Sequence, residues 1–220
     1  MLGGAPGMSG ALSQGLRGTW NRLPERVKRP ALAWRYGAPP QRQWLREAMN
    51  RELGALLDSL DAPSLDAVEV SGALHRDRPW RSYTQLEYPD FDLCDPPSAL
   101  ESFDLVICEQ VLEHVRDPCT AAATLSALCR DGGRVLVSTP FLLRIHDHPG
   151  DYWRFTPDGL RILLEANGLS VAWVHSWGNR AAVRANLSRW KTYRRWRSLD
   201  NDERTPIVVW ALAEKGPTAG

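Results

Sequence analysis

The feature of this sequence that most constrains its fold is a pair of short apolar runs separated by a helical stretch. Residues 103–108 (FDLVIC) and 134–138 (RVLVS) have the composition of buried strands, and residues 117–129 have apolar side chains at helical spacing. Parallel strands need a crossover of a dozen or more residues, usually a helix. The segment therefore predicts a strand–helix–strand unit in a parallel sheet that helices cover on both faces.

Further helices and strands are expected on either side of this unit. Apolar residues at helical spacing predict a helix over residues 41–60, and Thr156 followed by Pro157 predicts the start of another. Gly132 and Gly133 are expected to end the helix of residues 117–129. We predict an α/β fold, with a Rossmann-like, doubly wound, mostly parallel sheet in a single domain. Additional strands are expected at residues 65–70, 83–87, 169–177 and 207–213.

The chain is expected to consist of an N-terminal arm and one domain. Residues 1–40 are rich in Gly, Pro and Arg, and their prolines exclude a long helix, so we expect an irregular arm. Residues 41–220 suffice for one hydrophobic core. Within this domain, residues 180–202 form a basic and aromatic insertion.

The insertion has the pattern of an amphipathic helix. Residues 180–197, from Arg180 to Arg197, contain seven basic residues and no acidic residue, and their apolar side chains fall roughly on one helical face. Such a helix could be a lid over an acceptor, bind a polyanionic substrate or make peripheral contact with an anionic membrane. It could equally pack on its own domain with a solvated basic face.

The composition limits the partners and the compartment. The 27 basic and 26 acidic residues nearly cancel, which argues against nucleic acid as a partner. The four cysteines form no C-x-x-C pair, and no apolar run reaches the roughly 18 residues of a membrane span. We therefore expect a cytoplasmic protein. A transit peptide is the alternative, because no acidic residue precedes Glu25.

Two segments resemble a known family. Residues 103–118 (FDLVICEQVLEHVRDP) and 131–141 (DGGRVLVSTPF) resemble the fourth strand, fourth helix and fifth strand of small class I S-adenosylmethionine-dependent methyltransferases. Residues 146–168 resemble the region that follows the fifth strand in one bacterial branch of that family. The resemblance implies S-adenosylmethionine as cofactor and methyl transfer to a small-molecule or glycan-type acceptor, with a hydroxyl as the first choice.

The resemblance also implies a cofactor site at the carboxyl ends of the strands, where open parallel sheets bind ligands. Glu69 matches the acidic residue near the end of the first strand, and Ser71 and Gly72 stand where the family has a turn with more glycines. Glu109 and Gln110 follow the buried strand of residues 103–108 and are expected at the same crevice. A salt bridge to a nearby arginine is the alternative for Glu69.

Two further acids are assigned to the cofactor by the same resemblance. Glu87 matches the carboxylate that holds the ribose hydroxyls, and Asp95 matches the acid that accepts from the adenine amino group. Residues 82–95 are too few for a strand, a covering helix and another strand, so we expect the helix after the second strand to be absent. Solvated loop charge is the alternative for both acids.

The candidate catalytic residues are His146 and His148, which cluster with Asp147 and Asp151 after the strand of residues 134–138. An imidazole titrates near neutrality and suits a general base that takes a proton from an acceptor hydroxyl. A divalent metal ion that lowers the hydroxyl pKa, or a purely structural polar loop, are the other interpretations of the cluster. We assign no metal ligand from the sequence, and His114 is interpreted either as catalytic or as fixing its loop.

Two other functions remain open at this point. A non-catalytic scaffold is compatible with the loss of glycines around Ser71 and Gly72. An RNA methyltransferase is compatible with the basic residues 180–197, but the balanced charge argues against it, as does the absence of an Asn/Asp-Pro-Pro-Tyr motif.

Overall fold

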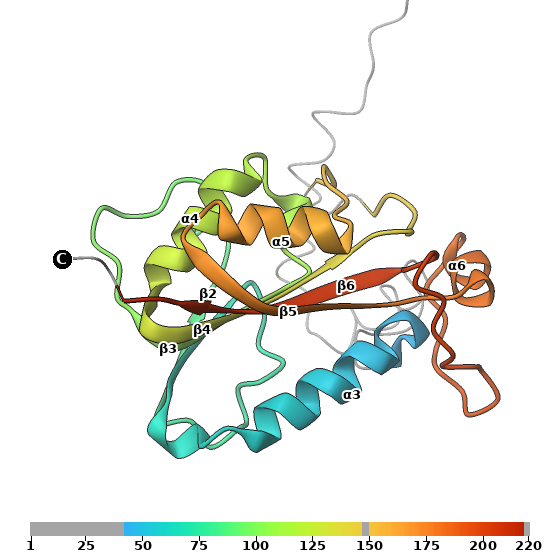
Figure 1. The fold of residues 1–220 in the computed structure, drawn as a ribbon, viewed down its shortest axis with the longest axis horizontal. Coiled ribbons are helices and arrows are strands. Elements are labelled where there is room, and N and C mark those ends of the chain that lie inside the picture. Colours follow the sequence, from blue (N-terminus) through green and yellow to red (C-terminus); the bar gives the residue numbers. More distant parts are fainter. Residues whose placement is uncertain (1–41, 147–149, 218–220) are drawn as a thin grey trace, which may run out of the picture.

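The computed structural model describes residues 42–146 and 150–217. The predicted N-terminal arm and His148 lie outside the described residues. The centre of the fold is a six-stranded sheet with the strand order β2-β1-β3-β4-β6-β5 (Figure 1). The strands are β1 (Asp66–Val70), β2 (Ser82–Leu86), β3 (Phe103–Glu109), β4 (Cys129–Pro140), β5 (Leu169–Trp177) and β6 (Val208–Lys215).

The sheet is mostly parallel, as predicted. Strand β1 pairs in parallel with β2 and β3, and β3 pairs in parallel with β4. Strand β6 runs antiparallel between β4 and β5. The predicted α/β architecture is confirmed, and the carboxyl ends of β1, β2, β3 and β4 share one edge of the sheet.

Helices cover both faces of the sheet and create two hydrophobic layers. Helices α4 (Pro118–Leu128) and α5 (Pro157–Glu165) lie on one face, and α3 (Trp44–Ser59) lies on the other (Figure 1). The first layer joins α4 and α5 to side chains such as Val106 and Val137, which are fully buried. The second layer joins α3 to Ile107 and Leu136, which are the strand neighbours of Val106 and Val137. Successive residues of a strand face opposite sides of the sheet, so the two pairs belong to different layers.

Side-chain caps explain where two of these helices begin. The Asp117 carboxylate accepts hydrogen bonds from the backbone N–H groups of Cys119 and Thr120, the free donors of the first turn of α4. The Thr156 hydroxyl accepts one from the backbone N–H of Gly159 at the start of α5, 3.0 Å away. Both starts agree with the sequence prediction.

The prediction that Gly132 and Gly133 end helix α4 is wrong. The helix ends at Leu128, and β4 begins at the next residue. Gly133 instead lies in a crowded stretch of β4, where a Cβ atom would come within 2.9 Å of the Arg130 carbonyl oxygen. The register of β3 and β4 shifts at this point, so the two glycines accompany an irregularity in the strand rather than a helix end.

The prediction of an amphipathic helix over residues 180–197 is correct only for the first two turns. Helix α6 spans only Arg180–Asn186. The buried Asn186 side chain donates to the Ala182 carbonyl oxygen and accepts from the Lys191 backbone N–H, 2.9 Å away, which turns the chain out of the helix. The following residues then run beside the start of α3, where the Lys191 carbonyl accepts the Trp44 backbone N–H.

Residues 87–102 contain neither helix nor strand, so the predicted absence of a helix after the second strand is confirmed. The connection from β2 to β3 is therefore an irregular segment that crosses the carboxyl end of the sheet. Within the described part of the chain, no helix combines the length and the apolar character that crossing a membrane requires.

Candidate functional site

A pocket of about 470 Å³ lies at the carboxyl ends of β1 and β3. Its floor is formed by the strand ends, and its walls by the irregular segment after β2 and by the turn after β3. The size and the position are those expected for a ligand site of an open α/β sheet. The residues that line it are Val70, Ser71, Tyr88, Phe91, Asp92, Leu93, Cys94, Gln110, Val111, His114, Val115, Arg116 and Tyr152.

Two residues at the floor of the pocket have left-handed backbone conformations. Ser71 follows β1 with φ 54°, and Gln110 follows β3 with φ 58°. Such conformations are uncommon outside glycine and concentrate at functional sites. The Ser71 N–H donates to the Leu86 carbonyl, and the Gln110 N–H to the Ser138 carbonyl, which fixes both turns to neighbouring strands. Both residues were predicted to contact the cofactor, and both line the pocket.

Glu69 closes the turn that follows β1. Its buried carboxylate accepts the backbone N–H groups of Leu74 and His75, at 2.8 and 3.1 Å, and the Tyr83 hydroxyl at 2.7 Å. Burial and the neighbouring Glu69 carboxylate raise the pKa of Tyr83 well above its usual value, so Tyr83 remains a donor. Glu69 therefore shapes the pocket from below through the turn, and its partners are backbone N–H groups and a phenol rather than an arginine.

Glu109 turns away from the pocket toward α3. Its buried carboxylate forms an ion pair with Arg46 and accepts from His75 Nε2, 2.7 Å away. Burial alone would raise the pKa of Glu109, but the hydrogen bond from His75 and the charge of Arg46 together lower it below its usual value. Glu109 thus joins α3, the turn after β1 and the end of β3.

The two acids predicted for the ribose and the adenine are exposed. The Glu87 carboxylate accepts from the Gln85 side chain, and the Asp95 N–H donates to the Asp92 carbonyl. Neither residue is among those that line the pocket, whereas Asp92 is. Contacts of Glu87 and Asp95 with a cofactor remain predictions, and Asp92 is an additional candidate that the sequence reasoning missed.

The predicted base His146 lies behind His114, which lines the pocket. The two imidazole rings meet edge to face with centroids 5.0 Å apart. His114 Nε2 and His146 Nε2 lie 3.6 and 3.7 Å from the same oxygen, Oε1 of the fully buried Glu113. The predicted catalytic region and the turn after β3 therefore meet in one cluster.

Backbone hydrogen bonds fix the segment around Tyr152 to this cluster. The Tyr152 N–H donates to the Glu113 carbonyl oxygen at 2.7 Å, which brings the Tyr152 side chain to the pocket wall. Burial alone would raise the pKa of Asp151, but hydrogen bonds from Arg154 and from the His146 backbone N–H lower it below its usual value. Asp151 is therefore an anion that holds the chain next to His146.

One signal in the sequence could have revealed the partner of Glu109. Arg46 shares the apolar stripe of α3 with Met49 and Leu53, which follow it at helical spacing, and it is only 6% exposed. A charge on a buried helical face needs an opposite charge nearby. Asp92 offered no such signal, because it lies in a segment without periodicity.

Comparison with known proteins agrees with this geometry. A family profile described as a methyltransferase domain matches residues 53–174, which is more than half of the chain. The chain therefore belongs to the S-adenosylmethionine-dependent methyltransferase family. The family, the fold class, the enzyme class and the cofactor expected from the sequence are confirmed.

Individual relatives are distant. A ubiquinone biosynthesis O-methyltransferase of Aeromonas salmonicida is 44% identical over 39 residues, which cover 18% of this chain and 16% of that protein. The chain thus matches about a sixth of the length of this curated relative.

Solved structures with the same fold are similar over most of the chain. An S-adenosylmethionine-dependent methyltransferase from Mesorhizobium loti has a TM-score of 0.50 and 14% identity, covering 78% of this chain and all of its own. The cyclase SpnF has a TM-score of 0.52 and 13% identity, covering 82% of this chain and 85% of its own. The fold is thus shared with proteins of different reactions, so the reaction must be argued from the site.

The pocket has the groups that S-adenosylmethionine needs. The apolar side chains of Phe91, Leu93 and Val111 offer surface for a flat base. Asp92 and Gln110 supply polar atoms that can bond to amino and hydroxyl groups. The turn after β1 is closed by Glu69 although it contains only Gly72 as a glycine, so the reduced glycine content leaves a defined floor. We therefore find that the residues present fit the cofactor of the family.

Proposed function

We propose that this methyltransferase transfers the methyl group of S-adenosylmethionine to an oxygen of a small-molecule or glycan-type acceptor. The observation that supports this most directly is the wall of the pocket at His114, behind which lie the His146 ring and the Glu113 carboxylate. A hydroxyl acceptor must lose its proton as the methyl group is transferred, so it needs a group nearby that favours the ionised oxygen. The sulfonium donor is already reactive, and the remaining task is alignment of the nucleophile.

The acceptor is proposed to enter beside Tyr152, opposite the strand ends. Tyr152 lines the pocket with about half of its surface exposed, and its backbone is held on Glu113. The cofactor would occupy the part next to Ser71, Asp92 and Gln110. This arrangement would bring the acceptor oxygen between the donor and the histidine cluster.

A screen for formation of S-adenosylhomocysteine tests the proposal. Phenols, catechols and sugars are offered as hydroxyl acceptors, with amines and RNA as competing classes, and product mass identifies the methylated atom. We expect turnover with a hydroxyl acceptor, a large loss in His146→Ala and little change in His175→Ala, whose ring lies on β5. Turnover only with amines or only with RNA would contradict O-methylation, and the RNA case would support the alternative that rests on residues 180–197.

The non-catalytic scaffold is the alternative that the few glycines around Ser71 and Gly72 suggested. The closed turn at Glu69 argues against a lost cofactor site. Direct binding of S-adenosylhomocysteine by the full chain distinguishes the two, since a scaffold that has lost the site would bind neither form of the cofactor.

A further inference from the structure

Three side chains at the inner wall of the pocket have an arrangement that the methyl-transfer proposal does not explain. Glu113 and His114 come from the short helix Leu112–His114 after β3, and His146 comes from the segment after β4. One potential ligand atom from each lies within 4.8 Å of the other two. The chain thus brings two imidazoles and one carboxylate, from segments about thirty residues apart, to a single point.

Glu113 is the least expected member of this group. It is fully buried, and among the described residues neither of its carboxylate oxygens accepts a hydrogen bond. An ionised carboxylate without hydrogen bonds is costly in the interior, so buried acids are normally paired or bind metal ions. Among the described residues, the basic side chains beside it are His114 and His146, whose Nε2 atoms lie 3.6 and 3.7 Å away, too distant for hydrogen bonds.

Both imidazoles turn Nε2 toward the Glu113 carboxylate. His114 Nδ1 contacts the carbonyl oxygen of Gly150, which can only accept, so Nδ1 carries the proton and the lone pair of Nε2 faces Glu113. His146 Nδ1 lies 3.2 Å from Asp151 Oδ2 without forming a hydrogen bond to it, and His146 Nε2 lies on the Glu113 side. Metal-binding histidines typically hydrogen-bond their second nitrogen to a carbonyl or a carboxylate, which fixes the ring, and His114 does so through Gly150.

We propose that Glu113, His114 and His146 bind a divalent transition metal ion. Ligands about 2.0–2.2 Å from a tetrahedral metal ion lie roughly 3.4 Å apart. The two Glu113–histidine separations would need to contract by a few tenths of an ångström, and the two imidazole nitrogens, which lie within 4.8 Å of each other, by up to about 1.4 Å. Imidazole nitrogens favour Zn²⁺, Fe²⁺ or Co²⁺ over Mg²⁺, Ca²⁺ and Mn²⁺, which prefer oxygen ligands. The ion would be the positively charged partner that the buried Glu113 carboxylate lacks.

The position of this site gives the ion a role in the proposed reaction. Three protein ligands leave at least one coordination position open, as in catalytic metal sites. Because His114 lines the pocket, an ion held by it would lie next to the proposed acceptor region. A hydroxyl bound there would have a lower pKa and would lose its proton more readily. This part rests on the proposed function, and in the metal-bound state His146 acts as a ligand rather than as a base.

Metal binding by the full chain, without S-adenosylmethionine or acceptor, tests the site itself. Tag-free protein is treated with a chelator and titrated with Co²⁺ while its visible absorption is recorded, and with Zn²⁺ while its Tm is measured. We expect one equivalent of metal ion to bind and to raise Tm. In Glu113→Gln and His146→Ala the affinity should fall at least about tenfold. His175→Ala is the matched control, because His175 is exposed and pairs with Glu52 on α3.

A second readout separates a metal site from a merely structural role of Glu113. In the presence of chelator, Glu113→Gln should be at least as stable as the wild type, because the substitution removes a buried charge without hydrogen bonds. In the presence of Zn²⁺ the wild type should be the more stable of the two proteins, since it binds the ion more tightly and gains more stability from binding.

The proposal is overturned if the wild type binds no stoichiometric metal ion, if Glu113→Gln and His146→Ala bind as tightly as the wild type, or if His175→Ala loses binding equally. A destabilised Glu113→Gln protein in chelator would contradict it as well. Binding of S-adenosylhomocysteine is measured on the same protein. Cofactor binding without metal binding overturns the metal site alone, and metal binding without cofactor binding overturns the proposed function alone.

Discussion

Gly72 lies directly against the carboxylate of Glu69, so that a Cβ atom on residue 72 would come within 2.8 Å of Glu69 Oε1. The carboxylate cannot move aside freely, because it is buried and accepts hydrogen bonds from the Leu74 and His75 N–H groups and from Tyr83. The single glycine of this turn is therefore required by Glu69, whether or not its backbone also approaches the cofactor.

Gly72→Ala should consequently disturb the floor of the pocket. We expect a loss of about 1–3 kcal/mol in the free energy of unfolding from overpacking, and affinity for S-adenosylhomocysteine at least about tenfold weaker, equivalent to about 1.4 kcal/mol. Urea unfolding and calorimetric titration measure the two effects.

Gly54→Ala serves as the control for this substitution. Gly54 lies inside α3, where an added Cβ atom would meet nothing beyond the helix's own backbone within 4 Å. Alanine should therefore raise stability by about 0.5–1 kcal/mol and leave cofactor affinity unchanged. Equal cofactor affinity in Gly72→Ala and Gly54→Ala would contradict the role given to the Gly72 contact.

The buried pair of Arg46 and Glu109 predicts a non-additive effect on stability. Arg46→Met leaves the Glu109 carboxylate buried with only His75 as partner, and removal of one member of a buried pair costs about 3–5 kcal/mol. The double variant Arg46→Met/Glu109→Gln should recover much of this loss, because the uncompensated charge is gone. Urea unfolding of the two single variants and the double variant measures the coupling, and simple additivity would argue against a shared electrostatic role.

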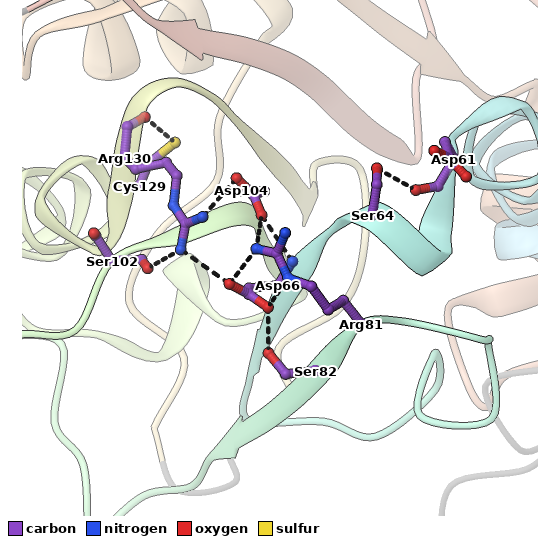
Figure 2. Close-up of polar contacts among 9 residues, drawn as sticks. All are labelled: Asp61, Ser64, Asp66, Arg81, Ser82, Ser102, Asp104, Cys129 and Arg130. Atoms are coloured by element: carbon purple, nitrogen blue, oxygen red, sulfur yellow. Dashed lines mark hydrogen bonds and ion pairs between the residues drawn. The ribbon is translucent and has the colours of Figure 1, made fainter.

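Charged residues at the opposite edge of the sheet predict a pH dependence of stability. Figure 2 shows Asp66 at the start of β1 and Asp104 in β3 bridged by Arg81 and Arg130. Hydrogen bonds from Arg81, then from Ser82 and Arg130, lower the pKa of Asp66 well below its usual range. The contribution of Asp66 is thus fully present above the unfolded-state pKa of about 3.9 and decreases as the pH falls below it.

Asp66→Asn should therefore lower Tm at neutral pH and reduce the loss of Tm between about pH 5 and about pH 3. Asp58→Asn is the matched control, because Asp58 is 74% exposed in its pair with Arg78, and exposed pairs contribute little. Thermal unfolding across this pH range measures both variants. A wild-type pH profile that Asp66→Asn leaves unchanged would contradict the predicted linkage.

The free cysteines should differ strongly in reactivity. Cys119 is exposed near the start of α4, whereas burial raises the pKa of Cys129 to about 11 and raises that of the buried Cys108 further. At about pH 8 we expect iodoacetamide to modify Cys119 first and to spare Cys108 and Cys129 until the protein unfolds. Mass spectrometry of the labelled peptides gives the order, and early labelling of Cys129 would contradict the packing at the start of β4.

Much of the fold follows from local sequence patterns. The strand Leu169–Trp177 was predicted with its observed bounds, and the starts of α4 and α5 were predicted through Asp117 and Thr156, because apolar periodicity and caps are local signals. The two errors have a common cause. Gly132 and Gly133 lie in a strand irregularity, and Asn186 ends α6 early through contacts that depend on tertiary structure.

The site was less predictable than the fold. Ser71 and Gln110 were predicted because they follow strand ends, which sequence patterns locate well, and both line the pocket. Asp92 lies in an irregular segment whose path over the sheet depends on packing, so the sequence favoured the nearby Asp95 instead. The absence of hydrogen bonds to the buried Glu113 carboxylate could not be predicted for a different reason. Burial without a hydrogen-bond partner is a property of the folded molecule and leaves no pattern in the sequence.

The central claim is that the pocket at the carboxyl ends of β1 and β3 binds S-adenosylmethionine. Calorimetric titration of the full chain with S-adenosylmethionine and S-adenosylhomocysteine tests it most directly, repeated with Asp92→Ala and with Asp95→Ala. We predict binding of one ligand per chain, weakened at least about tenfold by Asp92→Ala, which removes about 1.4 kcal/mol or more, and less affected by Asp95→Ala. Absence of binding to well-folded protein, or binding that Asp92→Ala leaves unchanged, would contradict the assignment of the pocket.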